Sequence, residues 1–340
     1  MNRQRIISLV AGFVSILGTF LVLEFALRVG YPLYRSYNSE MWRYGRFLKV
    51  ISDDPQIGHE HRPSSEGDFY GVHIKTNSEG WRDREYSLIP PADKRRVMVL
   101  GDSLTLGWGV NHEDAYPRIL ENLLTQSSQP TEVINTGVGN YNTIMEVKSY
   151  AKKGEKYRPD AIVVGFYIND AEVIQHRQSA LTYQLQHTYL YSLLADRWLN
   201  LKVRLTPTLH YKDFYSKLYE PGFPGRSAIA DAFTELSDRA REMRIPVHVA
   251  LIPEMHQFKD YPFQAAHDFV IEACRMNQLD VVDLLPYFIN ENPDSLWVSS
   301  EDAHPNRRGQ EIIAKGIFES FFKKSKPSQR QLASKVEGKS

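Results

Sequence analysis

Apolar residues follow two different patterns along this chain of 340 residues. The first is an uninterrupted run: 18 uncharged, mostly apolar residues extend from Ile6 to Leu23, and three more follow Glu24. About eighteen such residues are enough to cross a bilayer as a helix. A buried core helix is the alternative, but globular helices of this length rarely lack a polar face.

The flanks of this run indicate an uncleaved signal anchor. Arg3 and Arg5 precede it, as in a signal sequence, but no small-residue cleavage motif follows it. Four arginines between residues 28 and 46 weaken the charge contrast that orients a membrane span. We expect residues 1–29 to form a single-pass transmembrane signal anchor, with the rest of the chain outside the cytoplasm, in the periplasm or at the cell surface.

The second pattern begins at Arg96, where short apolar runs alternate with segments of helical spacing. The apolar runs have strand length and cover Val97–Leu100, Val133–Ile134, Ala161–Phe166, Val247–Ile252 and Val281–Leu285. The helical segments cover Tyr116–Leu124, Thr143–Lys153, Ser227–Arg241, Phe263–Met276 and Gly309–Phe322. This alternation predicts an α/β fold over residues 96–322, in which helices cover both faces of a parallel sheet.

Three segments fall outside this alternation. Residues 30–95 combine aromatic residues, turn-forming residues and a strand-like stretch from Tyr70 to Thr76, which predicts a linker and a short β-rich lead-in. Residues 171–221 are rich in Tyr, Leu and Gln and have no strand partner, so we expect a helical insertion. Residues 323–340 are polar and basic, and we expect a disordered tail.

Charge and cysteine content exclude some classes of function. The chain carries 41 Lys and Arg against 41 Asp and Glu, whereas a nucleic-acid-binding protein shows a clear basic excess. Residues 1–29 carry +2 and residues 323–340 carry +5, which leaves −7 between them. We therefore expect no nucleic-acid partner, and a basic tail that can contact anionic lipid. The single cysteine, Cys274, excludes an intramolecular disulfide and cysteine-rich metal sites.

Two distant segments could supply a nucleophile and its base. Gly101-Asp102-Ser103 ends the first strand of the alternation, at the sheet edge where open α/β folds bind ligands. His304 follows two carboxylates, and a carboxylate that accepts one ring N–H leaves the other ring nitrogen as a base. A serine hydroxyl needs such a base to become a good nucleophile. The alternative for the second segment is a helix N-terminus capped by Asp302 or Asn306.

Two further segments end the next two strands on the same edge. Asn135–Thr143 is a turn rich in glycine and asparagine, and Gly165–Asp170 contains Asn169. Backbone N–H groups in such a turn, and an asparagine amide, can stabilise the oxyanion that forms on an attacked carbonyl. Turn formation and helix capping are the alternative roles.

Together, these four blocks resemble the SGNH or GDSL hydrolase family, in which they occur in the same order. The resemblance implies a flavodoxin-like three-layer fold, Ser103 as nucleophile and His304 as general base. It also implies an oxyanion hole made of the Ser103 N–H, the Asn140 N–H and the Asn169 side chain, without a metal or other cofactor. The N-terminal anchor and the stretch from Asn77 to Asp83 are similar to membrane-tethered bacterial members.

The chain departs from the family pattern at two positions. Asn140 stands where the family usually has glycine, but asparagine tolerates a positive φ better than most residues. The family usually places Asp three residues before the catalytic histidine, where this chain has Glu301. Asp302 lies only two residues before His304. We favour Asp302 as the residue that orients His304, and Glu301 remains the alternative.

The resemblance therefore predicts a serine esterase that cleaves an acyl ester, specifically an acetyl ester, through an acyl-enzyme. The substrate would be a small acyl ester or a polysaccharide. An O-acetyltransferase that modifies a cell-surface polysaccharide is the alternative, because it would use the same triad. A non-catalytic envelope scaffold or binding subunit is a third hypothesis, against which the intact Ser103, Asn169 and His304 argue.

Several other residues are assigned to structure rather than to chemistry. His59 and His61 have no further ligand spacing, so we expect them to be exposed to solvent and not to bind a metal. Trp108 and Tyr167 border the expected pocket, and we expect them to pack in its wall; shaping the binding of the acyl group or the acceptor is the alternative. Cys274 lies on an amphipathic helical segment, which places it in the core.

Overall fold

The computed structural model describes residues 3–127, 130–173, 186–205 and 211–323. Its centre is a five-stranded parallel sheet with the strand order β6-β5-β7-β8-β9. Numbered along the chain this order is 2-1-3-4-5, the flavodoxin-like order. The α/β fold with a parallel sheet is confirmed. The strands are β5 (Arg95–Gly101), β6 (Thr131–Asn135), β7 (Ala161–Phe166), β8 (Val247–Leu251) and β9 (Asp280–Asp283).

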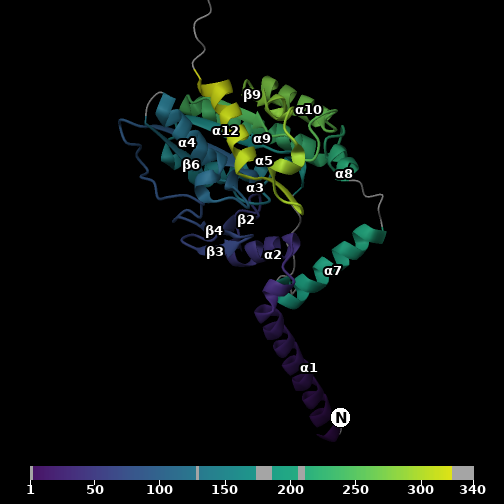
Figure 1. Ribbon diagram of the computed structural model, residues 1–340. Coiled ribbons are helices and arrows are strands. Elements are labelled where there is room, and N and C mark those ends of the chain that lie inside the picture. The colour runs from purple at the N-terminus through teal and green to yellow at the C-terminus, as the bar shows by residue number, and fades with distance from the viewer. Residues whose placement is uncertain (1–2, 128–129, 174–185, 206–210, 324–340) are drawn as a thin grey trace, which may run out of the picture.

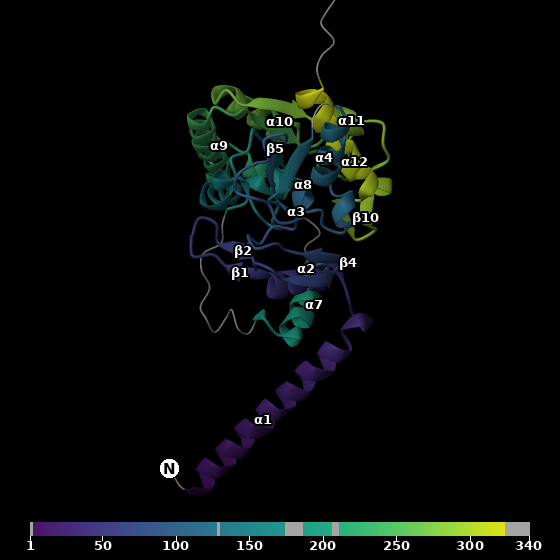
Figure 2. The ribbon, with the colours of Figure 1, turned by 90° about the vertical axis from the view of Figure 1, so that its left-hand side faces the viewer.

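Helices cover both faces of this sheet (Figure 2). Successive residues of a strand point to opposite faces, so Val97 and Val99 of β5 pack in one core, and Met98 and Leu100 pack in the other. The Val97 face is covered by α4 (Tyr116–Ser127), α11 (Leu285–Phe288) and α12 (Arg307–Ile317). The other face is covered by α5 (Thr143–Ser149), α9 (Pro224–Met243) and α10 (Gln264–Met276).

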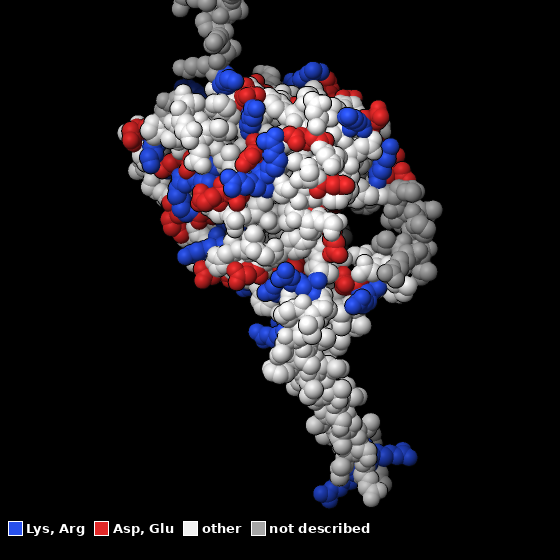
Figure 3. All heavy atoms as spheres, viewed as in Figure 1, with Lys and Arg blue, Asp and Glu red and all other residues white. Residues whose placement is uncertain are grey.

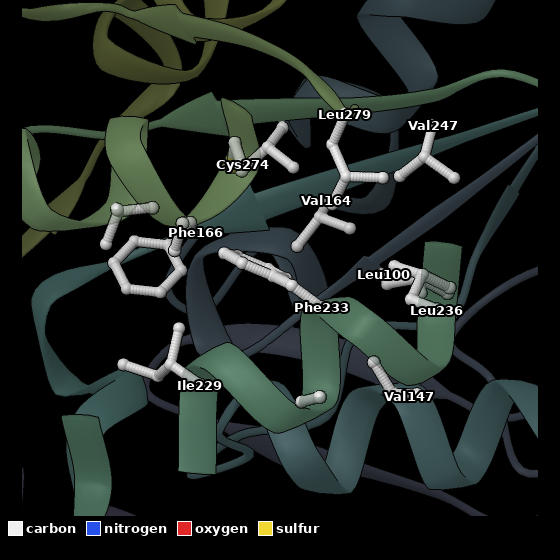
Figure 4. Packing of buried hydrophobic residues seen from close by; sticks show 14 of the residues in the cluster. Leu100, Val147, Val164, Phe166, Ile229, Phe233, Leu236, Val247, Cys274 and Leu279 are labelled. Atoms are coloured by element: carbon white, nitrogen blue, oxygen red, sulfur yellow. The ribbon is translucent and has the colours of Figure 1, made fainter. Parts of the chain in front are cut away.

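The second core shows how the layers are joined (Figure 4). Phe233 of α9 is fully buried, with its ring centroid 6.2 Å from that of Phe166 at the end of β7. Val164 of β7 and Cys274 of α10 belong to the same buried cluster. Cys274 therefore lies in the core, as predicted.

Short elements complete the chain around the sheet. A hairpin of β10 (Trp297–Ser299) and β11 (Asp302–Pro305) precedes α12, and the single-turn helix α3 (Ser103–Leu106) follows β5. The other short helical turns are η1 (Tyr31–Leu33), η2 (His112–Asp114), η3 (Tyr150–Gly154), η4 (Glu155–Tyr157), η5 (Ile168–Ala171), η6 (Pro293–Leu296) and η7 (Phe318–Phe322).

The segment from residue 30 to residue 95, here called the lead-in module, lies between the sheet domain and the N-terminal helix (Figures 1 and 2). It holds two hairpins, as its β-rich composition predicts, and also a 12-residue helix that the sequence analysis did not anticipate. Ser36 starts this helix with a capping box that includes Ser39. The elements are α2 (Tyr37–Leu48), β1 (Lys49–Ile51), β2 (His59–His61), β3 (Glu66–Phe69) and β4 (Val72–Lys75).

Three further helices belong to the segments expected to be an anchor and an insertion. They are α1 (Arg3–Val29), α7 (Tyr189–Leu205) and α8 (Tyr211–Leu218). Among the described residues, α1 is the one helix long and apolar enough to span a bilayer, and a signal sequence has the same character. It projects away from the rest of the molecule (Figure 1). The residues expected to form the basic tail lie outside the described residues from position 324 onward.

Candidate active site

Ser103 lies at the carboxyl edge of the sheet, on the first residue of α3 directly after β5. The turn is tight: a Cβ on Gly101 would meet the Thr105 hydroxyl at 1.9 Å, so the strand can pass this point only as glycine. Asp102 caps α3 by accepting the Leu104 N–H at 2.8 Å. The strand end and the cap together hold Ser103 at the start of the helix, facing the pocket.

The hairpin β10–β11 brings His304 to this serine from 201 residues further along the chain. His304 Nε2 lies 2.8 Å from Ser103 Oγ, and His304 Nδ1 lies 2.5 Å from Asp302 Oδ1. The His304 backbone N–H donates to the same carboxylate oxygen at 3.0 Å. The Glu301 side chain is exposed and is not bonded to His304. The structure thus joins Ser103, His304 and Asp302 in one hydrogen-bonded line.

Trp108 secures the far end of this line. Its indole N–H donates to Asp302 Oδ2 at 3.0 Å, and its side chain is almost completely buried. Burial disfavours the Asp302 carboxylate, but the hydrogen bonds from His304 and Trp108 outweigh it and hold the pKa of Asp302 below its usual range. Trp108 therefore does more than pack in the wall of the pocket, because it also holds the carboxylate that is bonded to His304. Tyr167, by contrast, does line the pocket.

The expected oxyanion donors lie on the neighbouring turns. Asn140 has a φ of 63°, the left-handed conformation that its side chain tolerates, and no other described residue accepts its N–H. Asn169 lines the same pocket, and its Nδ2 donates to Asp102 Oδ2 at 3.0 Å. One amide hydrogen of Asn169 is thus used to fix its orientation, while the second remains for a ligand.

Asp102 has a role in the site that the sequence does not predict. It accepts from the Leu104 N–H and from the Asn169 amide, and burial raises its pKa. Its position in the Gly-Asp-Ser block, directly before a helical turn, could have identified it as a cap. Its link to Asn169 depends on the third strand and could not be read from spacing.

The lead-in module clamps the turn that carries Asn140. Lys49 Nζ donates to the Gly139 carbonyl at 2.5 Å and to Asn140 Oδ1 at 3.0 Å, and His59 Nε2 donates to the same carbonyl at 3.0 Å. Tyr44 accepts the Gly139 N–H at 2.9 Å. A Cβ on Gly139 would come within 2.8 Å of the Tyr44 ring, so this contact requires glycine.

The histidine pair of the lead-in module is not exposed as predicted. His61 is only 2% exposed, and His59 is half-buried against Tyr141. Tyr44 donates to His61 Nε2 at 2.5 Å, and His61 Nδ1 donates to the Gly80 carbonyl at 2.9 Å. Burial lowers the pKa of His61 to about 3, which keeps the ring neutral. The prediction that His59 and His61 are exposed was wrong because the residues that cover them come from other segments of the chain.

The stretch from Asn77 to Asp83 holds the turn that follows Ser103. Arg82 is fully buried, and its guanidinium donates to the carbonyls of Gly107 at 2.7 Å and Val110 at 2.9 Å. Asp83 accepts the Asn135 N–H at 2.9 Å and forms an ion pair with Arg118. These bonds satisfy backbone groups that would otherwise be buried without partners, and they tie the turns after β5 and β6 together.

A cavity of about 720 Å³ opens above these turns. Ser103, His304 and Asn169 line it, and its other lining residues come from several parts of the chain. The lead-in module contributes Tyr37, Met41 and His59, whereas α8 contributes Tyr211 and Tyr215. The described residues contain no group of three or more acidic, histidine or cysteine side chains arranged to hold a metal ion.

A sequence comparison decides the family. The model of the GDSL-like Lipase/Acylhydrolase family matches residues 99–312, well over half of the chain. The chain belongs to this family. The prediction of an enzyme that acts on ester bonds is thereby confirmed, while membrane anchoring stays a prediction. A search of curated proteins finds no match.

Several solved structures are similar to this member of the family. TesA is 10% identical, with a TM-score of 0.45 over 67% of this chain and 98% of its own. Esterase EstA from Pseudoalteromonas sp. is 12% identical, with a TM-score of 0.43 over 66% of this chain and 96% of its own. The acetyl xylan esterase AlAXEase is 16% identical, with a TM-score of 0.41 over 67% of this chain and 100% of its own.

The neutral His61 makes one prediction about stability. Its pKa is about 3 in the folded chain and about 6.5 when unfolded, so below pH 6.5 the unfolded chain binds the extra proton. Stability should therefore fall as the pH drops. Between pH 7.5 and pH 5, wild type should lose about 2 kcal/mol more than His61→Gln. Urea unfolding of both chains in detergent measures this difference, and equal losses would contradict a neutral buried His61.

Proposed function

We propose that the chain is a serine esterase that hydrolyses an acyl ester, specifically an acetyl ester, through an acyl-enzyme. The observation that carries this proposal is the continuous line from Ser103 Oγ through His304 to Asp302, which opens into the cavity. In this line one ring nitrogen faces the serine and the other faces a carboxylate, the arrangement that makes a serine nucleophilic.

In the first half of the reaction, Ser103 Oγ attacks the acyl carbonyl carbon while His304 Nε2 takes its proton. Asp302 stabilises the imidazolium that forms. The N–H groups of Ser103 and Asn140 and the Asn169 amide donate to the oxyanion. When the bond to the leaving alcohol breaks, His304 returns the proton to the alcohol oxygen, which leaves the acyl group on Ser103.

In the second half, a water molecule attacks the acyl carbonyl and His304 accepts the proton of the water. The bond to Ser103 Oγ then breaks, His304 protonates the serine, and the carboxylic acid is released. If a sugar hydroxyl replaces this water, the same steps transfer the acyl group to the sugar. The cavity is much larger than an acetyl group needs, so it has room for a carbohydrate as leaving group or acceptor.

We further propose that α1 anchors the chain in a membrane, with the enzyme domain outside the cytoplasm. The support is the length and apolar character of α1 and the two arginines before its apolar run. The acyl ester would then be a small molecule or a polysaccharide outside the cytoplasm.

Ser103→Ala provides the direct test of this function. The full chain in detergent should hydrolyse a chromogenic acetyl ester, and Ser103→Ala should lower kcat by about 10³-fold or more. A fluorophosphonate should label wild type on Ser103 and leave the variant unlabelled. Equal activity of both chains, or no activity in either, would overturn the proposal. Faster acetyl transfer to an added oligosaccharide than to water would identify the transferase instead.

A matched pair of variants tests which carboxylate orients His304. Because His304 is bonded to Asp302, Asp302→Asn should lower kcat by about 10²- to 10⁴-fold. Glu301→Gln should stay within about 3-fold of wild type, since a surface change of this kind has little effect. Steady-state kinetics on the same ester measures both. An inactive Glu301→Gln beside an active Asp302→Asn would reverse the assignment.

Lys49 provides a test of the clamp on the Asn140 turn. Lys49→Met removes the donors to the Gly139 carbonyl and Asn140 Oδ1, so the oxyanion donor should lose its position. We expect kcat to fall by about 10- to 100-fold with little change in KM. Lys152→Met is the control, because Lys152 bonds the lead-in module through Glu60 without touching the turn. An unchanged kcat in Lys49→Met would show that the clamp does not position the donor.

A further inference from the structure

Helix α7 starts against the C-terminal part of α1. The Glu24 carboxylate of α1 accepts the Tyr189 N–H at 2.7 Å and the Leu190 N–H at 3.0 Å, which are the first two N–H groups of α7. A carboxylate at a helix N-terminus satisfies unpaired donors and interacts favourably with the helix dipole. The start of α7 is therefore held against α1 at Glu24, which lies five residues before the end of α1 at Val29.

The inner face of α7 packs on the lead-in module. Asp196 accepts from Ser36 Oγ at 3.2 Å and from Asn38 Nδ2 at 3.1 Å, and the Tyr189 ring lies edge-on to Trp42 with 5.0 Å between centroids. Figures 1 and 2 show α7, in teal, beside the end of α1, and in Figure 2 it lies below α2. On this face α7 is a docked part of the protein.

The outer face of α7 carries an exposed apolar stripe. Tyr191, Leu194, Trp198 and Leu201 are spaced by three, four and three residues, so they share one side of the helix. All four are exposed, and Trp198 is 67% exposed. Soluble proteins rarely leave such a stripe in water, and tryptophan and tyrosine are enriched where a protein meets the membrane interface.

The exposed apolar surface continues onto the end of α1. Val29 is exposed, and Leu33, four residues beyond the helix, is 92% exposed. Basic residues flank this surface, since Arg28, Arg35 and Arg197 are all exposed. Figure 3 shows Lys and Arg side chains where the globular part meets α1. Apolar side chains among basic ones are the composition of a surface that binds anionic lipid.

The length of α1 determines where this apolar surface lies relative to the bilayer. From Ile6 to Glu24 the helix rises about 27 Å, close to the roughly 30 Å of a bilayer's hydrocarbon core. Glu24 therefore reaches the far edge of that core when Ile6 lies at the near edge. Because Glu24 holds the first residues of α7, the apolar stripe starts at the boundary between acyl chains and headgroups.

We propose that α7 lies on the outer surface of the bilayer that α1 spans, with its stripe of Tyr191, Leu194, Trp198 and Leu201 in the lipid. This inference rests on the proposed membrane anchor. The bilayer is thus contacted at two places, by a spanning helix and by a surface helix docked on the lead-in module. Two such contacts fix the orientation of the sheet domain relative to the bilayer. The next described helix after α7 is α8, whose Tyr211 and Tyr215 line the pocket.

The chain allows a direct measurement of this contact. Its single cysteine is buried, so a Cys274→Ala background leaves no competing thiol. Nitroxide labels are attached to Leu194→Cys and Trp198→Cys in the full chain, reconstituted in vesicles of phosphatidylethanolamine and phosphatidylglycerol. Collision rates with oxygen, which concentrates in lipid, and with a water-soluble nickel chelate report the environment of each label. We expect oxygen to dominate at both positions by at least about 3-fold.

Three reference positions complete the experiment. Asn200 lies on α7 away from the stripe, and Met276 lies on α10 with 76% of its surface exposed. Labels on Asn200→Cys and Met276→Cys should therefore both favour the nickel chelate. Phe13→Cys, within α1, should favour oxygen most. If Phe13 favours oxygen while Leu194 and Trp198 match Met276, the surface helix is wrong and the anchor stands. If Phe13 also matches Met276, the anchor and the surface helix both fail.

Ester hydrolysis is measured on the same labelled chains, which all keep the residues around Ser103. If labels at positions 194 and 198 show no lipid contact while the chains still hydrolyse the ester, only the surface helix is overturned. Lipid contact without any hydrolysis, in wild type as well, would instead overturn the proposed function and leave the surface helix in place.

Discussion

The site depends on buried side chains of the lead-in module that hold backbone groups of the sheet domain. Arg82 binds the carbonyls of the turn after Ser103, and Lys49 binds the carbonyl of Gly139 beside Asn140, the proposed oxyanion donor. Turns at a sheet edge have few bonds of their own, so their geometry is set by whatever satisfies their N–H and C=O groups. In this protein the lead-in module satisfies these groups, with basic side chains that are themselves buried.

This arrangement joins the part of the molecule that the family model covers to a part that lies outside that match. The family match begins at residue 99, after the lead-in module has ended. Yet Lys49, His59 and Arg82 precede that point and contact the turns that carry the proposed chemistry. Burial lowers the pKa of Lys49 to about 7, because enclosing the amine in this clamp disfavours its charged form.

Most of the sheet domain could be predicted because its signals are local. The apolar runs identified all five strands within a few residues, since strands covered on both faces read as continuous apolar stretches. The roles of Ser103 and His304 were predicted from the resemblance of four sequence blocks to the family, and Asp302 was favoured over Glu301 as the residue that orients His304. Helix α2 was not predicted because its aromatic residues were assigned to a linker, although Ser36 before it is a local signal for a helix start. The burial of His61 and the bond from Trp108 to Asp302 depend on partners far away in sequence, which periodicity does not reveal.

The contact between Gly139 and Tyr44 also limits how this protein can evolve. A side chain at position 139 would collide with the Tyr44 ring, and a smaller residue at position 44 would leave the Gly139 N–H without its acceptor. The two positions can therefore change only together, although they are 95 residues apart. Recombination that exchanges the lead-in module between relatives should succeed only where the donor and recipient already agree at both positions.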